Sequence, residues 1–510
     1  MHDEHTVGLG TAQTAPVEQR TQAAERLAHS ITELALCAHP QAAHAAFVLL
    51  QRVLAPALDF DIRTCVPHHV RGQVERHGEA VKRTLKACLG AAELPDQAWC
   101  LVNCRGELGG FSVRVPALFE RHAAARWAAM RSLEAQVRKA AETYHMEWPT
   151  KLVQAAYLDA SAHLAACGIC TETGLPRLQP LWEEWARQAP PAAEALDRIA
   201  QSPKRSLQGA ACHLAEILAS ARLWHASDSN DRQRIEASAG ELGQIIYADA
   251  PREPREGWIE TSEWRLHSLL QLGMATVPAG ARCCLVPAGG PNAGQACGRT
   301  LGHQIVHQGR CSAGEQRVRV HNAGRHALAT RLHHCGLSTD QECAVPGWAK
   351  LDAKTGKLVE AVIDIETRVP GSTLYTRVDI EAVHSEATSN RRTDVRKLLA
   401  DAEATKIARY GPHVSPLVVL LRGRLGEHAL WTLRCLANQC SCTSGETPSR
   451  IFRSLAHRLM TAIATTEARA RMQSLGGAAT AQHVANRTLE QKEAAEPSAH
   501  AEGHEHVALG

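Results

Sequence analysis

Apolar residues recur at helical spacing through most of the first half of the chain. In the segment 26–139, side chains such as Leu50 and Leu54 follow each other at intervals of three and four residues, which predicts amphipathic helices. A second helical region is predicted over 152–247, and one more helix over 258–275. The first half of the protein is therefore predicted to be α-helical.

The pattern changes after Pro278, where short alternating segments appear. Segments 358–367 and 373–383 alternate apolar and polar residues on either side of Pro370-Gly371, which predicts a β-hairpin. The continuous apolar run 416–421 predicts a buried central strand. Helices are predicted around these strands, over 321–336, 391–409 and 448–475. This order of elements predicts an α/β domain with a mixed sheet.

The length of the chain predicts more than one domain. A chain of 510 residues is longer than a single core needs, so a multidomain protein is expected. The expected division is a disordered segment 1–25, a helical region 26–139, a helical linker region 140–257, a helix leading into a Cys-His segment 258–312, the α/β domain 313–475 and a disordered tail 476–510.

Charge and cysteine usage limit the classes of function. The net charge of +3 is too small for a basic surface over the whole molecule, so any signal for nucleic acid must be local. The 17 cysteines have no regular spacing, and the amino terminus lacks the pattern of a secretion signal. No apolar run of membrane-spanning length was recognised. We therefore expect an intracellular protein without a membrane partner, whose thiols are free or bound to metal.

Cysteine, histidine and glycine concentrate between Cys283 and Cys311. The segment has too few apolar residues to offset the entropy of its own ordering, so a stabilising metal ion is expected. Tetrahedral zinc takes four thiolate or imidazole ligands. The predicted ligands are Cys284, Cys297, His307 and Cys311, with His303 as a substitute. The alternative is a chance cluster in a chain rich in both residue types.

The helix that follows is basic. Five arginines and one acid, Glu315, lie between Arg310 and Gly336. A local excess of this kind is typical of contacts to phosphates, and the alternative is a solvated helix face. The predicted DNA contacts are Arg317, Arg319, Arg325 and Arg331.

Acidic residues face one another across the predicted hairpin. With the turn centred on Gly371, Asp364 lies nearly opposite Asp379. The period of two places Glu360, Asp364, Glu366, Asp379 and Glu381 on one face. Opposed like charges are unfavourable unless a cation lies between them, and Mg²⁺ with oxygen ligands fits. The alternative is a solvated face neutralised by Arg368 and Arg377.

Several short motifs occur in a fixed order along the second half. They are Val320-His321-Asn322, Glu342 with the run Val345-Pro346-Gly347-Trp348, Ile363-Asp364-Ile365, Val378-Asp379-Ile380, and a helix with Lys406 and Tyr410. This order resembles the carboxy-terminal part of non-LTR retrotransposon reverse transcriptase polyproteins, which carry a restriction-like endonuclease of the PD-(D/E)xK superfamily. Upstream, Leu108-Gly109-Gly110-Phe111 is similar to a turn after the polymerase palm, so 26–139 would be a thumb-like region.

The resemblance implies roles for individual residues. Asp364 and Asp379 would bind Mg²⁺, Lys406 would orient or activate the attacking water, and Glu342 would support the metal. The Cys-His segment would be a CCHC-type zinc knuckle. No polymerase catalytic aspartate pair is visible, since Tyr247-Ala248-Asp249-Ala250 lacks the second aspartate.

The expected function is therefore Mg²⁺-dependent cleavage of target DNA by a hydrolase that also contains Zn²⁺ and has no polymerase site. DNA is the expected partner, element RNA is a second candidate, and the expected location is the nucleus. Two alternatives remain open at this point. One is a catalytically inactive nucleic-acid-binding remnant of a retroelement, and the other is an α-helical scaffold without a nucleic-acid role.

Overall fold

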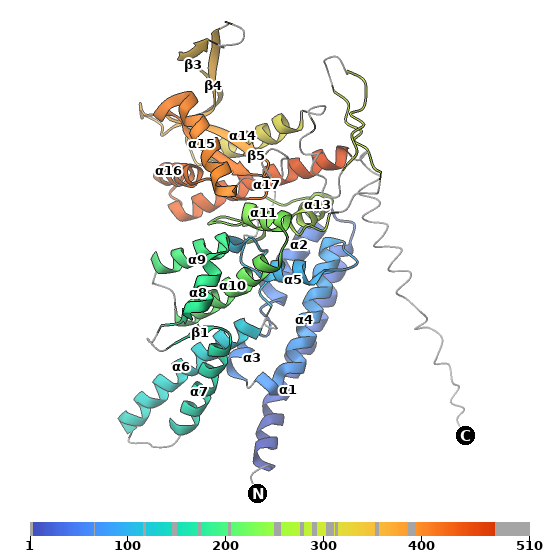
Figure 1. Ribbon diagram of the computed structural model, residues 1–510, viewed down its shortest axis with the longest axis vertical. Coiled ribbons are helices and arrows are strands. Elements are labelled where there is room, and N and C mark those ends of the chain that lie inside the picture. The colour runs from blue at the N-terminus through green and yellow to red at the C-terminus, as the bar shows by residue number, and fades with distance from the viewer. Residues whose placement is uncertain are drawn as a thin grey trace, which may run out of the picture.

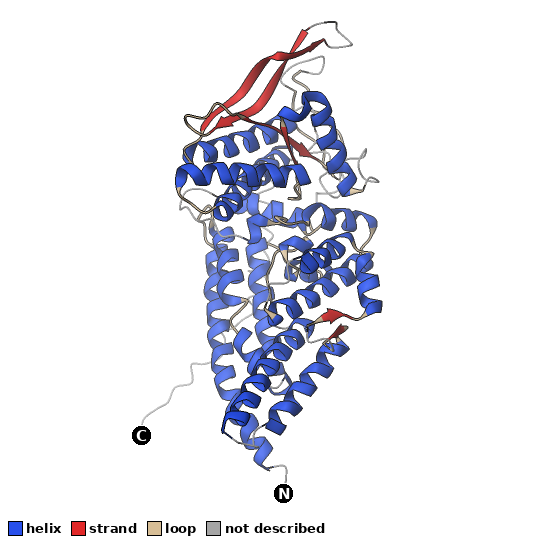
Figure 2. Ribbon diagram, turned by 90° about the vertical axis from the view of Figure 1, so that its left-hand side faces the viewer, coloured by secondary structure: helices blue, strands red, loops and turns tan. Residues whose placement is uncertain are grey.

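Alanine-rich amphipathic segments form helices over most of the chain, and strands are confined to small sheets (Figure 2). The computed structural model describes residues 4–65, 67–115, 119–144, 150–171, 175–201, 206–248, 257–275, 280–287, 293–301, 311, 315–351, 356, 358–385 and 394–474. The molecule is elongated, with the long helices α1 and α4 towards one end and α14–α17 towards the other (Figure 1).

The elements follow the predicted order with additions. The first half contains α1 (Glu4–Leu36), α2 (Ala42–Leu49), η1 (Leu50–Leu54), α3 (Asp59–Thr64), α4 (Pro67–Leu89), α5 (Asp96–Asn103), η2 (Gly106–Leu108), α6 (Phe119–Tyr144), α7 (Thr150–Ala166), β1 (Ile169–Cys170), β2 (Arg177–Leu178), α8 (Pro180–Arg187), α9 (Pro190–Gln201), α10 (Leu207–Ala226), α11 (Ser229–Ser238), α12 (Ile245–Ala248) and α13 (Thr261–Gln271). The second half contains α14 (Gln316–His334), β3 (Ser338–Leu351), β4 (Leu358–Arg368), β5 (Thr376–Val383), α15 (Val395–Tyr410), η5 (Gly411–His413), β6 (Ser415–Leu420), α16 (Glu427–Ser444) and α17 (Pro448–Ser474).

Helix α1 covers most of the segment expected to be disordered. Val17, Thr21 and Ala24 follow one another at three-and-four spacing, and all three side chains are buried. On the same helix, the Arg20 guanidinium donates to the carboxylate of Asp61. The expectation of disorder over 1–25 is therefore wrong for this part of the segment, whereas the tail 476–510 lies outside the described residues.

The stretch Ala42–Asp61 is apolar enough, by length and composition, to cross a membrane. The expectation that no apolar run reaches membrane-spanning length is wrong for this stretch. In the fold it supplies core side chains, because Phe47, Leu50 and Leu54 are fully buried. The core helix of a globular protein passes the same composition test, so the stretch alone is weak evidence for a membrane span.

A mixed sheet lies at the upper end of the molecule in Figure 1. Within the described residues its strand order is β3-β4-β5-β6, with antiparallel pairing up to β5 and parallel pairing of β6 with β5. The predicted hairpin and mixed sheet are confirmed. The run 416–421 does form a buried strand, but β6 is an edge strand and not a central one. It is buried because α15 and α16 pack against it.

Helix α17 joins the two halves of the molecule. It contacts α14 and α16 on one side and α12 and α13 on the other. Buried apolar residues form one continuous cluster that extends from Val17 to Ala464. Inside this junction, Glu467 and Arg471 form an ion pair that is almost completely buried, and Gln271 Nε2 donates to the carbonyl oxygen of Arg422 at 3.0 Å. The sheet region and the helical half therefore share a core.

Candidate functional site

The hairpin brings Asp364 and Asp379 together where β4 and β5 separate. The backbone ladder pairs Ile365 with Val378, so Asp364 faces Asp379 at the next position. There the Asp364 carboxylate takes the place of a backbone acceptor, because its Oδ2 accepts a hydrogen bond from Ile380 N at 2.6 Å. Both aspartates are buried, with 8% and 4% of their surfaces exposed. The predicted opposition of the two carboxylates is present.

Two further elements supply side chains to this acidic pair. Lys406 on α15 has its Nζ 2.6 Å from Asp379 Oδ2 and 3.6 Å from Glu381 Oε2. His321 on α14 has its Nε2 3.0 Å from Asp364 Oδ1. The sequence motifs named His321 without giving it a role, and they left Glu381 outside the candidate site. The resulting group, here called the acidic site, consists of His321, Asp364, Asp379, Glu381 and Lys406.

The acidic site contains more carboxylates than positively charged groups. Burial and the neighbouring Asp364 carboxylate raise the pKa of Asp379 to about 6, although Lys406 acts in the opposite direction. Burial also acts to raise the pKa of Asp364, but hydrogen bonds from His321 and Ile380 N outweigh it and lower that pKa. Burial acts to lower the pKa of Lys406, whereas the adjacent Asp379 raises it. Lys406 is therefore a cation at neutral pH and not a general base.

Glu342 does not extend the acidic site in the way the resemblance implied. It occupies the position on β3 that would face Asp364, but its φ of +53° interrupts the strand there. Its carboxylate pairs with Arg325 on α14, and 62% of the side chain is exposed. The described ion pair of Glu342 is thus with Arg325 and not with a residue of the acidic site.

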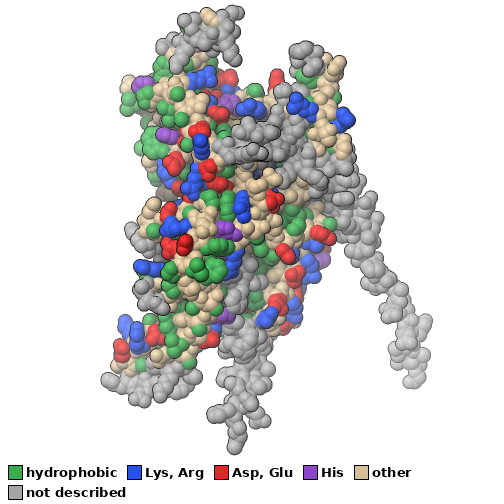
Figure 3. Space-filling view, in the orientation of Figure 1, with side chains coloured by type: hydrophobic (Ala, Val, Ile, Leu, Met, Phe, Trp, Pro, Cys, Tyr) green, Lys and Arg blue, Asp and Glu red, His purple; other side chains and the backbone are tan. Residues whose placement is uncertain are grey.

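The four arginines predicted to contact DNA fall into two groups. Arg317 and Arg319 are exposed near the start of α14. Arg325 is largely covered and paired with Glu342, and Arg331 is buried with its guanidinium 3.0 Å from Glu446. The prediction is therefore wrong for Arg331, because it lies beside Leu328 and Leu332 on the apolar face of the helix. On the face drawn in Figure 3, basic and acidic side chains are interspersed, in keeping with the small net charge.

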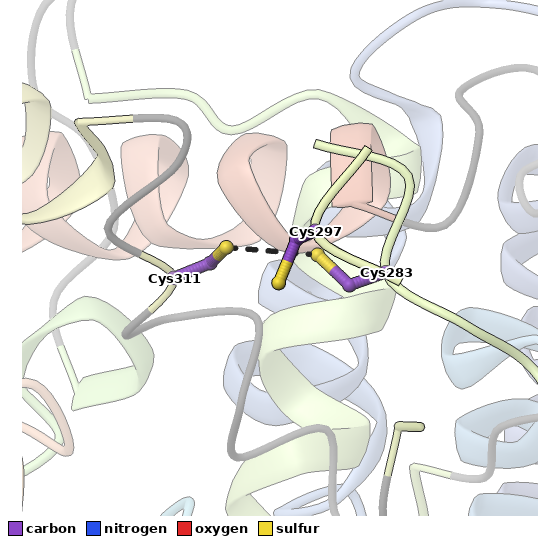
Figure 4. A group of neighbouring side chains, drawn as sticks. All are labelled: Cys283, Cys297 and Cys311. Carbon is purple, nitrogen blue, oxygen red and sulfur yellow. Dashed lines mark hydrogen bonds between the residues drawn. The ribbon is translucent and has the colours of Figure 1, made fainter. Parts of the chain in front are cut away.

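A second group of chemical interest is formed by three cysteines. The Sγ atoms of Cys283, Cys297 and Cys311 all lie within 4.8 Å of one another, and the side chains point towards a common centre (Figure 4). Cys283 and Cys297 come from two paired segments, in which Cys283 N donates to Arg299 O and Cys297 N donates to Leu285 O. These three residues could bind a metal ion such as zinc.

The predicted ligand set is corrected at one position. Cys284 points away from the cluster, and its Sγ donates to the carbonyl oxygens of Gln473 and Ser474 at the end of α17. Cys283 takes its place because successive side chains of an extended segment point to opposite sides. Cys297 and Cys311 are as predicted, whereas His307 and His303 lie outside the described residues.

The three thiols differ in acidity. Burial, together with the neighbouring Cys311 and Cys297, raises the pKa of Cys283 to about 12. The pKa of Cys297 is lowered, because hydrogen bonds from the Arg299 backbone, Cys311 and Cys283 outweigh the effect of burial. Cys297 is therefore the more acidic thiol of the two. A soft metal ion would replace the thiol protons, which is the usual behaviour of a thiolate site.

Exchange of single cysteines tests the corrected set. We expect the purified, reduced protein to contain about one zinc ion per chain. Cys283→Ser should lose most of it, while Cys284→Ser should retain it, since only Cys283 faces the cluster. Elemental analysis of both variants and the wild type measures this. Equal zinc in the two variants, or none in the wild type, would contradict the site.

Comparison with known proteins adds no assignment. No model of a known protein family matches the chain, and no curated protein matches it as a relative. The geometry of the acidic site and of the cysteine cluster is therefore the basis for assigning a function.

Proposed function

We propose that the protein is a retrotransposon-derived endonuclease that hydrolyses phosphodiester bonds of DNA, with a PD-(D/E)xK-type site and Mg²⁺ as its cofactor. One observation carries the proposal. Two carboxylates on diverging strands, Asp364 and Asp379, are hydrogen-bonded to each other, and Lys406 on the following helix contacts Asp379. The hairpin register places the two aspartates opposite each other. Lys406 reaches them from a separate helix, so local sequence does not enforce its position there.

The chemistry of the donor set fits a divalent cation. Asp364, Asp379 and Glu381 offer carboxylate oxygens, and one lysine opposes them. The raised pKa of Asp379 reflects this excess of negative charge in a buried setting. Mg²⁺ prefers such hard oxygen ligands. Asp364 and Asp379 would hold the ion, which when bound would polarise the phosphate and lower the pKa of a bound water.

The other residues of the acidic site have separate tasks. Lys406 remains protonated, so it would stabilise negative charge that develops on the phosphate oxygens in the transition state. His321 and the Ile380 amide each hold one oxygen of Asp364, which fixes the orientation of that carboxylate. The exposed Arg317 and Arg319 would contact the DNA backbone without reading its sequence. With DNA as substrate, the proposed location is the nucleus.

Replacement of Lys406 tests its role as the cation of the site. We expect Lys406→Met to slow nicking of a supercoiled plasmid in Mg²⁺ by about 10²–10³-fold, the usual cost of one electrostatic contact to a transition state. Lys397→Met, an exposed lysine on the same helix, should cut at the wild-type rate. Equal rates for the two variants would remove Lys406 from the mechanism.

An inactive nucleic-acid-binding remnant is the second candidate. The observation that favours it is Glu342, whose carboxylate pairs with Arg325 and leaves the acidic site with one ligand fewer than the resemblance implies. A wild-type protein that binds DNA but cuts it with neither Mg²⁺ nor Mn²⁺ would select this candidate.

A further inference from the structure

Flat side chains form a continuous stack beside the acidic site. The guanidinium of Arg377 lies 5.2 Å from the ring centre of Trp348 and 5.8 Å from that of Tyr375. Trp348 stacks on His413 with ring centres 6.0 Å apart. Arg368 lies 5.0 Å from the centre of the Tyr375 ring and donates to its hydroxyl at 2.9 Å. We call these five residues the Arg-aromatic stack.

The stack adjoins the proposed catalytic residues. Arg377 precedes Asp379 by two residues on β5, so both side chains leave the same face of the sheet, roughly 7 Å apart along the strand. His413 lies in η5, which directly follows the helix that carries Lys406. A substrate bound at the acidic site would therefore reach the stack within one or two nucleotides.

The stack reaches the surface at His413 and at Tyr375. Tyr375 is 45% exposed, His413 is exposed, and Trp348 and Arg377 are partly covered. Ring faces at the surface are open to a partner. Its members are also fixed in place, since Glu366 holds the Arg377 guanidinium at 2.7 Å. A rigid, solvent-facing series of rings is preorganised for another planar group.

The positive charge of the stack favours a partner that carries negative charge as well as planar groups. The Glu366 carboxylate is neutralised by Arg377. Within the described part of the chain no acidic group pairs with Arg368, whose contacts go to Tyr375. A guanidinium that contacts an aromatic ring and has no acidic partner among the described residues suits a chain of alternating phosphates and bases, because the cation attracts phosphate and the rings stack on bases.

We propose that the Arg-aromatic stack binds an unpaired DNA strand next to the bond that is cut. This inference rests on the proposed function and adds the form of the substrate. Bases inside a duplex already stack on each other and present no free face, so the stack selects single-stranded or locally opened DNA. The protein would therefore recognise a junction, in which the duplex ends and one strand continues unpaired.

Binding measurements without divalent ions test the proposal separately from cleavage. The probe is a fluorescent oligothymidylate of about twelve nucleotides, compared with a duplex and with an oligouridylate of the same length. We expect Tyr375→Leu to weaken oligothymidylate binding roughly 5- to 100-fold, the range for loss of one base-stacking contact. Duplex binding should change less than twofold. Arg368→Gln should weaken single-strand binding in the same direction.

Tyr144→Leu is the matched control, since Tyr144 is also an exposed tyrosine but lies at the end of α6. It should bind like the wild type. The proposal is overturned if Tyr375→Leu binds oligothymidylate as tightly as the control, if duplex binding falls equally, or if the wild type prefers oligouridylate. The binding assay does not measure cleavage, so it can be interpreted even if the protein does not cut DNA. Conversely, a failure of the stacking proposal does not affect the cleavage test of Asp364 and Asp379.

Discussion

Asp379→Asn is expected to abolish nicking of DNA while leaving the protein folded and able to bind DNA. The asparagine keeps the shape of the buried side chain but removes a carboxylate that would hold the metal ion. Metal-supplied stabilisation of a phosphate transition state is worth several kcal/mol, so the rate should fall about 10³-fold or more. DNA affinity should stay the same or rise, because a negative charge facing phosphate has been removed. Plasmid nicking and a binding titration measure the two effects.

Asp364→Asn should behave in the same way. A suitable control is Asp401→Asn, an exposed aspartate on α15, the helix that carries Lys406. It should nick at the wild-type rate. If the wild type nicks with Mg²⁺ and Asp379→Asn nicks just as fast, the assignment of the acidic site is wrong.

Glu467→Gln is expected to destabilise the protein by roughly 3–5 kcal/mol, the usual cost of removing one partner from a buried ion pair. Glu467 and Arg471 are 1% and 0% exposed. Burial acts to raise the pKa of Glu467, but the positive charges of Arg471 and Arg422 lower it to about 2. The glutamine variant would remove a carboxylate that offsets those positive charges in the core.

The pH dependence follows from the direction of this shift. A carboxylate whose pKa is lower in the folded state contributes stability above its unfolded pKa, near 4.5, and loses that contribution as the pH falls towards 2. The difference between wild type and Glu467→Gln should therefore shrink below about pH 4.5. Denaturant titrations at several pH values measure it.

Glu75→Gln provides the comparison for this prediction. Glu75 and Arg71 have the same spacing of four residues on a helix, but their side chains are 60% and 79% exposed. Water screens such a pair, so the variant should lose much less stability than Glu467→Gln does. If Glu467→Gln and Glu75→Gln lost the same free energy of unfolding, burial would not make the Glu467–Arg471 pair more important for stability than an exposed pair.

Much of the second half could be predicted because local pattern and tertiary structure agree there. The alternation on both sides of Pro370-Gly371 gave the hairpin, and its period of two placed Asp364 opposite Asp379. The strand β3 was missed, since its sequence mixes polar residues with a Pro-Gly pair. The helix α16 could have been found, because Ala429, Leu433 and Leu436 follow helical spacing.

The errors at candidate sites share one cause, which is the direction of a side chain. Cys283 and Cys284 are adjacent, and composition cannot separate them. Strand alternation could have done so, since Cys283 shares its side with Ala281 and Leu285, which pack against the same small core. Arg331 was counted as a surface charge although it lies three residues after Leu328, on the apolar stripe of α14.

Other features depend on contacts between distant segments. His321 meets Asp364 across 43 positions of sequence, and Arg377 meets Trp348 across two strands. Pattern analysis assigns such residues to elements but does not pair them, because their pairing is decided by how helices and strands pack. The shared core of the two halves was missed for the same reason.

The core shared by the two halves limits whether the sheet region can be inherited as a separate unit. A gene segment that began at residue 313, where the α/β domain was predicted to start, would encode α17 without α12 and α13, both of which α17 contacts in the fold. The freed side of the helix would carry apolar residues and the ionised Glu467 and Arg471 into water, and the polypeptide would tend to self-associate. Recombination that exchanges the sheet region alone is therefore disfavoured, and the two halves are expected to diverge together, as one heritable block.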